Sequence, residues 1–237
     1  VPRLWESLYS KIIATVMERG NRAFTMFNLL VKISIRFKKA QRQLRGHLPQ
    51  FAKAGLPVAF ARKLFALVEM LILALPYWLA QKKLAPLQEK FGGKLRMAVS
   101  GGGTLPFYLE SWLDAIGIRI TNAYGMTACA PAIAGRGYNS EIFATLGPPI
   151  DGTEVRIVDS EGKQVAAGEE GDVEVRGPQV FDGYIDNEEE NRKAFTADGF
   201  FHTGDLGKLT IHGELALTGR SKEIIVLASG ENIDPSR

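Results

Sequence analysis

The sequence predicts an α/β fold in which part of a parallel-sheet α/β subdomain, residues 1–145, is followed by a small β-barrel-like subdomain, residues 146–218. The first part rests on residues 95–127, where an apolar run, a glycine-rich turn, a helical repeat and a β-branched run follow one another, as in a βαβ unit. The second part rests on short alternating segments separated by glycine and proline turns. A chain of 237 residues with 46% hydrophobic content is long enough for one or two such cores.

Residues 1–91 are expected to be helical and basic. Residues 1–99 hold 18 Lys and Arg against 4 Asp and Glu, whereas residues 100–237 hold 11 against 22. One predicted helix, residues 33–45, places basic residues on one face and apolar residues on the other; these are Arg36, Lys38, Lys39, Arg42 and Arg45, opposite Ile33, Phe37, Ala40 and Leu44. This asymmetry favours an anionic membrane surface or an acidic partner, with a solvated basic face as the alternative. Nucleic acid is not expected, because its known binding motifs are missing.

An apolar segment follows at residues 64–79, where Glu69 is the only charged residue. A transmembrane helix needs about 20 apolar residues, and Pro76 interrupts this shorter segment. The segment therefore predicts either a buried helix or a helix that lies at a lipid interface.

The glycine-rich turn is residues 100–104, Ser-Gly-Gly-Gly-Thr, between the predicted first strand and a helix. Gly101, Gly102 and Gly103 would let a planar ligand lie directly on the backbone, where a Cβ atom would block it. The amide groups at the start of the following helix could add hydrogen-bond donors. A plain tight turn is the alternative, because the segment matches neither the Walker pattern nor G-x-G-x-x-G.

The second predicted strand, beginning near Ile118, carries Tyr124, Gly125 and Thr127 at its carboxyl end. In a βαβ unit the two strands are parallel, so this end and the glycine-rich turn should share one sheet edge, where α/β folds bind ligands. Tyr124 could stack on a purine and the Thr127 hydroxyl could reach a phosphate. For Tyr124 an ordinary core position is the alternative.

Two glycine-flanked polar residues stand out near the carboxyl end of the chain. Asp205 lies in Thr-Gly-Asp-Leu-Gly, and Arg220 follows after a short segment that is expected to form β structure. A carboxylate can accept both hydroxyls of a ribose diol, while a neighbouring guanidinium donates to the same sugar and orients the carboxylate. The pair therefore predicts a ribose site, with a simple turn capped by Asp205 as the alternative.

Five segments in this order resemble the adenylate-forming, AMP-binding superfamily: residues 100–106, 124–127, 177–184, 202–207 and 219–235. Within it, the chain is similar to long-chain fatty acyl-CoA synthetases and acyl-acyl-carrier-protein synthetases. Residues 1–6, Val-Pro-Arg-Leu-Trp-Glu, share this likeness. The resemblance thus extends nearly from end to end.

The resemblance implies a ligase that forms an acyl-adenylate from ATP and a long-chain fatty acid, and then transfers the acyl group to the thiol of CoA or of acyl carrier protein. It implies an adenine site at Gly101, Gly102, Gly103, Asn122, Ala123, Tyr124 and Gly125, a catalytic α-phosphate contact at Thr127, and a ribose site at Asp205 and Arg220. Lys222 matches the hinge of the family, so residues 219–237 would be this hinge and the start of a further C-terminal domain.

Two departures from the family pattern bear on activity. Ala128 occupies the position where the family usually has a Glu that helps to hold Mg²⁺, and an Ala side chain cannot bind this cation. The Thr-Gly-x-Pro-Lys loop of the family is missing. We therefore expect a central fragment that is inactive alone, with weakened or differently bound Mg²⁺. A nucleotide-binding relative with weakened catalysis and a basic membrane or carrier-protein docking module are the alternatives.

Cys129 is the only cysteine, which suits a reducing compartment, and no signal peptide is visible. The sequence therefore predicts a cytoplasmic protein, peripheral to a membrane if the basic half binds lipid. A nucleophilic role for Cys129 is disfavoured, because no His lies near it in the sequence.

Overall fold

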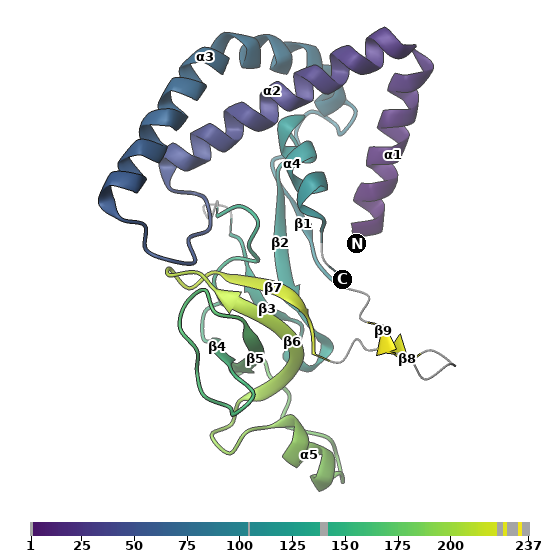
Figure 1. Cartoon of the computed structure of the whole chain (residues 1–237). Coiled ribbons are helices and arrows are strands. Elements are labelled where there is room, and N and C mark those ends of the chain that lie inside the picture. The colour runs from purple at the N-terminus through teal and green to yellow at the C-terminus, as the bar shows by residue number, and fades with distance from the viewer. Residues whose placement is uncertain (1, 104, 138–141, 222–224, 227–231, 234–237) are drawn as a thin grey trace. The chain divides into compact units, whose positions relative to one another are not determined.

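The computed structural model describes residues 2–103, 105–137, 142–221, 225–226 and 232–233 (Figure 1). The chain divides into two compact units. Unit 1 consists of Val1–Leu48, Ala54–Ala123 and Arg136–Ala144, and unit 2 of Pro49–Lys53, Tyr124–Gly135 and Thr145–Arg237.

Unit 1 is built mainly from four helices: α1 (Pro2–Glu18), α2 (Asn21–Arg45), α3 (Leu56–Glu89) and α4 (Phe107–Ala115). Helix α2 ends at Gly46, whose φ of 75° lies in the left-handed region that glycine adopts without steric cost. Helices α2 and α3 pack along each other (Figure 1). The stacked rings of Phe37 and Tyr77, 4.0 Å apart, join them. The helical character predicted for the basic part of the chain is therefore present.

The core of unit 1 gathers around α4. Leu109, Leu113 and Ile116 are fully buried there, together with Ile118 from the segment that leads to the next strand. The ring of Trp112 meets that of Tyr9 from α1 edge to face at 4.9 Å. The apolar residues that repeat at helical spacing in the sequence therefore face the interior.

A parallel strand pair confirms the predicted βαβ unit. Strand β1 (Ala98–Ser100) pairs with β2 (Ile120–Gly125), and α4 connects them. The register places Ala98 opposite Ile120 and Ser100 opposite Asn122. Both strands thus run in the same direction, and their carboxyl ends share one edge of the sheet.

The apolar residues 64–79 lie within α3 and are largely exposed. Leu71, Ile72 and Leu75 have 65%, 69% and 65% of their surface accessible, whereas the small Ala66 and Ala80 are buried. Of the two sequence alternatives, a buried helix is therefore wrong for most of this segment. Across the described part of the chain, we find no helix with the length and apolar character that crossing a membrane requires.

The basic face predicted for residues 33–45 is not a free surface. In α2, Lys38 and Arg42 both form ion pairs with Asp114 of α4, and Arg36 pairs with Glu69 of α3. Lys39 and Arg45 are exposed. Three of the five expected surface cations therefore form ion pairs within unit 1.

Unit 2 is centred on an antiparallel sheet in the order β4-β5-β6-β7. Its strands are β4 (Glu154–Val158), β5 (Gly171–Arg176), β6 (Phe201–Leu209) and β7 (Leu215–Arg220). The other elements are a 3-10 helix η1 (Thr127–Cys129), β3 (Ala132–Gly135), α5 (Glu188–Ala194), β8 (Ile225–Val226) and β9 (Asn232–Ile233). The β-rich character predicted for residues 146–218 is present, as a sheet whose strand order is open rather than a closed barrel among the described strands.

One face of this sheet forms the core of unit 2. Ile157, Val173, Val175, Phe201 and Leu215 are buried against one another. Tyr124 and Cys129 belong to the same apolar cluster. The segment that carries the Tyr-Gly-Met-Thr motif is thereby fixed against the sheet that carries Asp205.

Candidate functional site

Asp205 is the centre of the candidate site in unit 2. It lies on β6 and is buried, with only 4% of its surface accessible. The Tyr124 hydroxyl donates a hydrogen bond to Oδ2, and Arg220 Nε donates to Oδ1 at 2.9 Å. Strand pairing sets Arg220 directly opposite Asp205. The structure thus brings together three of the predicted site residues around one carboxylate.

The backbone around Asp205 is held as firmly as its side chain. The Asp205 amide donates to Thr203 Oγ1 at 3.1 Å, and the Thr203 hydroxyl donates to the carbonyl oxygen of Val173 at 2.8 Å. Gly204 between them has a φ of 74°, which a residue with a Cβ atom rarely adopts. The Thr-Gly-Asp sequence therefore suits this part of β6, where the register with β5 shifts.

The surroundings of Tyr124 keep its hydroxyl protonated. Burial, followed by the hydrogen bond to the Asp205 carboxylate, raises the pKa of the Tyr124 hydroxyl far above its usual range. Tyr124 is thus a permanent donor to Asp205. The Arg220 side chain is 62% exposed, so part of its guanidinium faces solvent. Each Asp205 oxygen has two acceptor positions, so the carboxylate can accept a ligand hydroxyl while it keeps its present partners.

Gly125 and Thr127, which follow Tyr124, have different structural roles. A Cβ atom at Gly125 would lie 1.9 Å from the carbonyl oxygen of Pro131, so only glycine fits there. Met126, next in the chain, donates its amide to that same oxygen at 2.7 Å. Thr127 is exposed at the start of η1. The motif therefore presents an accessible hydroxyl at a rigid turn.

Ala128 is half-buried and packs on the apolar cluster of unit 2. Its carbonyl oxygen accepts a hydrogen bond from the Phe181 amide at 2.8 Å, which ties residues 177–184 to the Tyr-Gly-Met-Thr motif. No group of three or more His, Cys, Asp and Glu side chains that could hold a metal ion occurs among the residues that the structure describes. The Ala128 side chain itself offers no oxygen to such a cation.

The other predicted nucleotide residues belong to unit 1. Gly101, Gly102 and Gly103 follow β1, and Gly102 has a φ of 73° with open space where a Cβ atom would point. A Cβ atom at Gly101 would meet the carbonyl oxygen of Ala123 at 3.4 Å. Asn122 is buried on β2 opposite Ser100. The turn and the strand end thus lie at the same edge of the sheet, as predicted. Lys222 lies outside the described residues.

The Cys129 thiol is fully buried, and this burial raises its pKa to about 11. A thiol of this kind is almost entirely protonated at neutral pH and is a poor nucleophile. The structure therefore supports the interpretation of Cys129 as a packing residue.

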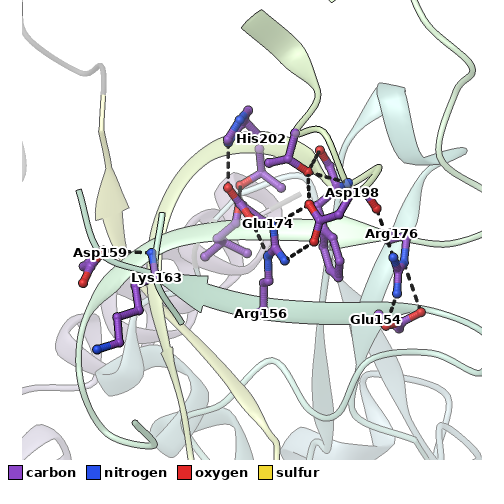
Figure 2. A network of polar contacts seen from close by, with 12 residues as sticks. Glu154, Arg156, Asp159, Lys163, Glu174, Arg176, Asp198 and His202 are labelled. Atoms are coloured by element: carbon purple, nitrogen blue, oxygen red, sulfur yellow. Dashed lines mark hydrogen bonds and ion pairs between the residues drawn. The ribbon is translucent and has the colours of Figure 1, made fainter. Parts of the chain in front are cut away.

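A polar network that sequence reasoning missed supports β6 from β4 and β5 (Figure 2). Glu174 is buried on β5, accepts a hydrogen bond from Arg156 Nε at 2.6 Å and lies 2.9 Å from His202 Nδ1. Arg156 also contacts Asp198 at 2.6 Å, and the hydrogen bonds from Arg156 and Thr196 hold the pKa of the Asp198 carboxyl well below its usual range. The register Arg156–Glu174–His202 could not be read from the alternating pattern alone.

We expect Glu174→Gln to destabilise unit 2 by about 1–3 kcal/mol, because it weakens a buried, charged hydrogen-bond acceptor that Arg156 and His202 share. Thermal or urea unfolding measures this change. Glu154→Gln is the matched control, since Glu154 forms an exposed pair with Arg176 in the same sheet and should change stability by less than about 1 kcal/mol. Equal effects of the two substitutions would show that the buried network does not support β6.

Comparisons with known proteins identify the family of the chain. The family model described as AMP-binding enzyme matches residues 23–185. The chloroplastic long-chain-fatty-acid–[acyl-carrier-protein] ligase AEE15 of Arabidopsis thaliana is 32% identical over 250 aligned residues, which cover 99% of this chain and 34% of that protein. The long-chain-fatty-acid–CoA ligase FadD15 of Mycobacterium tuberculosis is 39% identical over 150 residues, 63% of this chain and 23% of that protein.

Solved structures agree as well. The crystal structure of ATP-bound MatB from Rhodopseudomonas palustris matches with a TM-score of 0.54 and 32% identity, over 62% of this chain and 29% of that chain. The resemblance drawn from the five sequence motifs and the α/β fold are thereby confirmed. The chain spans about a third of the length of AEE15 and a smaller share of the other two proteins.

Proposed function

Because this chain belongs to the AMP-binding enzyme family, we propose that it is the central part of an ATP-dependent ligase that activates a long-chain fatty acid. The observation that carries the proposal is the buried Asp205 carboxylate, held between the Tyr124 hydroxyl and Arg220. AEE15 and FadD15 are named as ligases of long-chain fatty acids, one with acyl carrier protein and one with CoA. The proposed acceptor is accordingly the thiol of CoA or of acyl carrier protein.

In the proposed complex, Asp205 accepts hydrogen bonds from the two ribose hydroxyls of ATP or AMP, and Arg220 donates to the same sugar. The ring of Tyr124, fixed through its hydroxyl, stacks on the adenine. For Gly101–Gly103, Asn122 and Ala123 we propose contact with the adenine from the match to the family motifs, and Gly102 has open space where a Cβ atom would point. These assignments rest on the residue-by-residue match to the family motifs.

The proposed chemistry has two steps. An oxygen of the fatty acid carboxylate attacks the α-phosphorus of ATP, and the bond from that phosphorus to the pyrophosphate oxygen breaks, which releases pyrophosphate. The sulfur of the acceptor thiol then attacks the acyl carbonyl carbon, and AMP leaves. The exposed Thr127 hydroxyl is proposed to donate to an α-phosphate oxygen, where negative charge builds up during the first step. Lys222 is proposed as the hinge residue.

If Asp205 holds the ribose, Asp205→Ala weakens AMP binding to the complete protein by about 1.5–3 kcal/mol, the range for hydrogen bonds to a charged group. Isothermal titration calorimetry measures this loss, and circular dichroism reports whether the fold is intact. Asp151→Asn, at an exposed turn in unit 2, is the control and should bind AMP normally. An intact Asp205→Ala variant with unchanged affinity would overturn the ribose assignment.

Ala128 favours a second candidate function, a nucleotide-binding relative with weakened catalysis. We expect Ala128→Glu to raise carboxylate-dependent ATP–pyrophosphate exchange about tenfold, which corresponds to about 1.4 kcal/mol of transition-state stabilisation. Isotope exchange in the complete protein is the measurement. Ala197→Glu, at an exposed position in unit 2, controls for the added charge. Brisk exchange that falls in Ala128→Glu would contradict the missing-ligand interpretation, whereas no exchange in either protein, despite AMP binding, would favour the relative with weakened catalysis.

We further propose that α3 lies on an anionic membrane surface. Its exposed apolar residues include Leu64, Phe65, Leu71, Ile72 and Leu75. Exposed cations flank this stretch on the same helix, at Arg62 and Lys63 before it and at Lys82 and Lys83 after it. Apolar side chains between basic residues suit the boundary between acyl chains and anionic headgroups.

The cytoplasmic location expected from the sequence stays a prediction.

The membrane proposal predicts that the complete protein co-sediments with vesicles of phosphatidylcholine and phosphatidylglycerol more than with phosphatidylcholine alone. Binding should fall as salt rises, because exposed charges are screened over about 8 Å at physiological ionic strength. Ile72→Asp should reduce binding severalfold, whereas Ile185→Asp, at an exposed position in unit 2, should not. Absence of vesicle binding, with salt-sensitive binding to acyl carrier protein instead, would replace the membrane by the carrier protein as partner.

A further inference from the structure

Unit 1 contains a cavity of about 180 Å³ whose lining is dominated by cationic side chains. Helix α2 contributes Lys38, Arg42 and Arg45, and the segments beside β2 contribute Arg119 and Arg136. Among the described residues of the lining, Asp114 of α4 is the one acidic residue. We call this space the cationic cavity. None of these residues is among those assigned to the nucleotide or to the proposed reaction.

Among the described residues, the carboxylates that contact the cations of the lining are fewer than these cations. Asp114 is shared, because Lys38 Nζ lies 3.1 Å from its Oδ1 while Arg42 pairs with its Oδ2. Glu110 pairs with Arg136. Without counting Arg119, four cationic side chains of the lining contact or lie beside two carboxylates within the described part of unit 1. The excess positive charge in a partly enclosed space attracts an anion more strongly than the same charge on an open surface does.

Arg136 gives the second observation that points to a ligand. Its side chain is only 3% exposed, and its terminal NH2 group contacts Glu110. Its Nε atom is buried and has no hydrogen-bond partner among the described residues. A buried donor without an acceptor is destabilising, and an anion in the cavity that Arg136 lines would supply the acceptor.

The guanidinium groups are held in place before any ligand binds. The Arg42 guanidinium stacks 3.6 Å from the centre of the Phe143 ring, and that of Arg136 lies 5.5 Å from the same ring. Arg45 is exposed and has no ion pair within the described part of unit 1, so it can close on a ligand from the rim. Planar, preorganised guanidinium groups suit the oxygens of phosphoryl groups, to which they can donate in pairs.

The size of the cationic cavity limits the ligand. Sites that bury drug-sized molecules commonly have about 300–1,000 Å³, so a whole nucleotide would not fit inside this space. We propose that the cationic cavity binds a compact phosphoryl anion, namely orthophosphate, pyrophosphate or the phosphate end of a small phosphomonoester. This site goes beyond the proposed ligase activity and does not depend on it.

Calorimetric titration of the complete protein with orthophosphate, pyrophosphate and glycerol 3-phosphate, at an ionic strength held constant with potassium chloride, tests the proposal. We expect at least one of these anions to bind, and Arg45→Gln to weaken that binding about tenfold, as expected for a charged hydrogen bond. Arg22→Gln, an exposed position on the same helix outside the cavity, is the matched control and should bind as the unaltered protein does.

A further variant separates this site from the proposed nucleotide site. Asp205→Ala should leave phosphoryl-anion binding unchanged, because Asp205 is assigned to the ribose.

The three ligands distinguish the possible sources of the phosphoryl group. Preference for orthophosphate or pyrophosphate indicates a free inorganic anion, and preference for glycerol 3-phosphate indicates a phosphomonoester. Absence of binding by all three, or equal effects of Arg45→Gln and Arg22→Gln, would overturn the proposal.

Discussion

The buried charge of Asp205 is the constraint on which the organisation of unit 2 depends. A carboxylate that is removed from water is tolerated only when donors surround it, and here the donors come from two distant parts of the chain, Tyr124 and Arg220. The left-handed backbone at Gly204 and the hydroxyl of Thr203 fix the strand that carries it. The motif residues are therefore structural partners of one another as well as candidates for ligand contact.

Unit 1 uses charge in a different way. Asp114 draws Lys38 and Arg42 of α2 towards α4, so part of the basic character of the chain serves internal packing. Other cations, such as Arg45, line the cationic cavity, and others flank the exposed apolar stretch of α3. One compositional bias in the sequence thus corresponds to three physically distinct environments.

The sequence was sufficient for the α/β class, the βαβ unit and the Asp205–Arg220 pair, because glycine turns and strand periodicity act locally. It was insufficient for Lys38 and Arg42, since a helical pattern shows which residues share a face but does not show whether an acidic residue about 70 positions away will meet them. The same limit applies to Glu174, whose partners depend on strand register. For Tyr124 the sequence suggested a role for the ring, whereas the structure shows that its hydroxyl hydrogen-bonds to Asp205.

Cys129 gives unit 2 a built-in reporter. It is the only thiol in the sequence, it is fully buried beside the turn that carries Thr127, and its pKa of about 11 leaves little thiolate at neutral pH. Reagents can therefore reach it only when the apolar cluster around Tyr124 opens. The rate at which the thiol is modified under native conditions is then a measure of the free energy of that local opening, obtained without any introduced label.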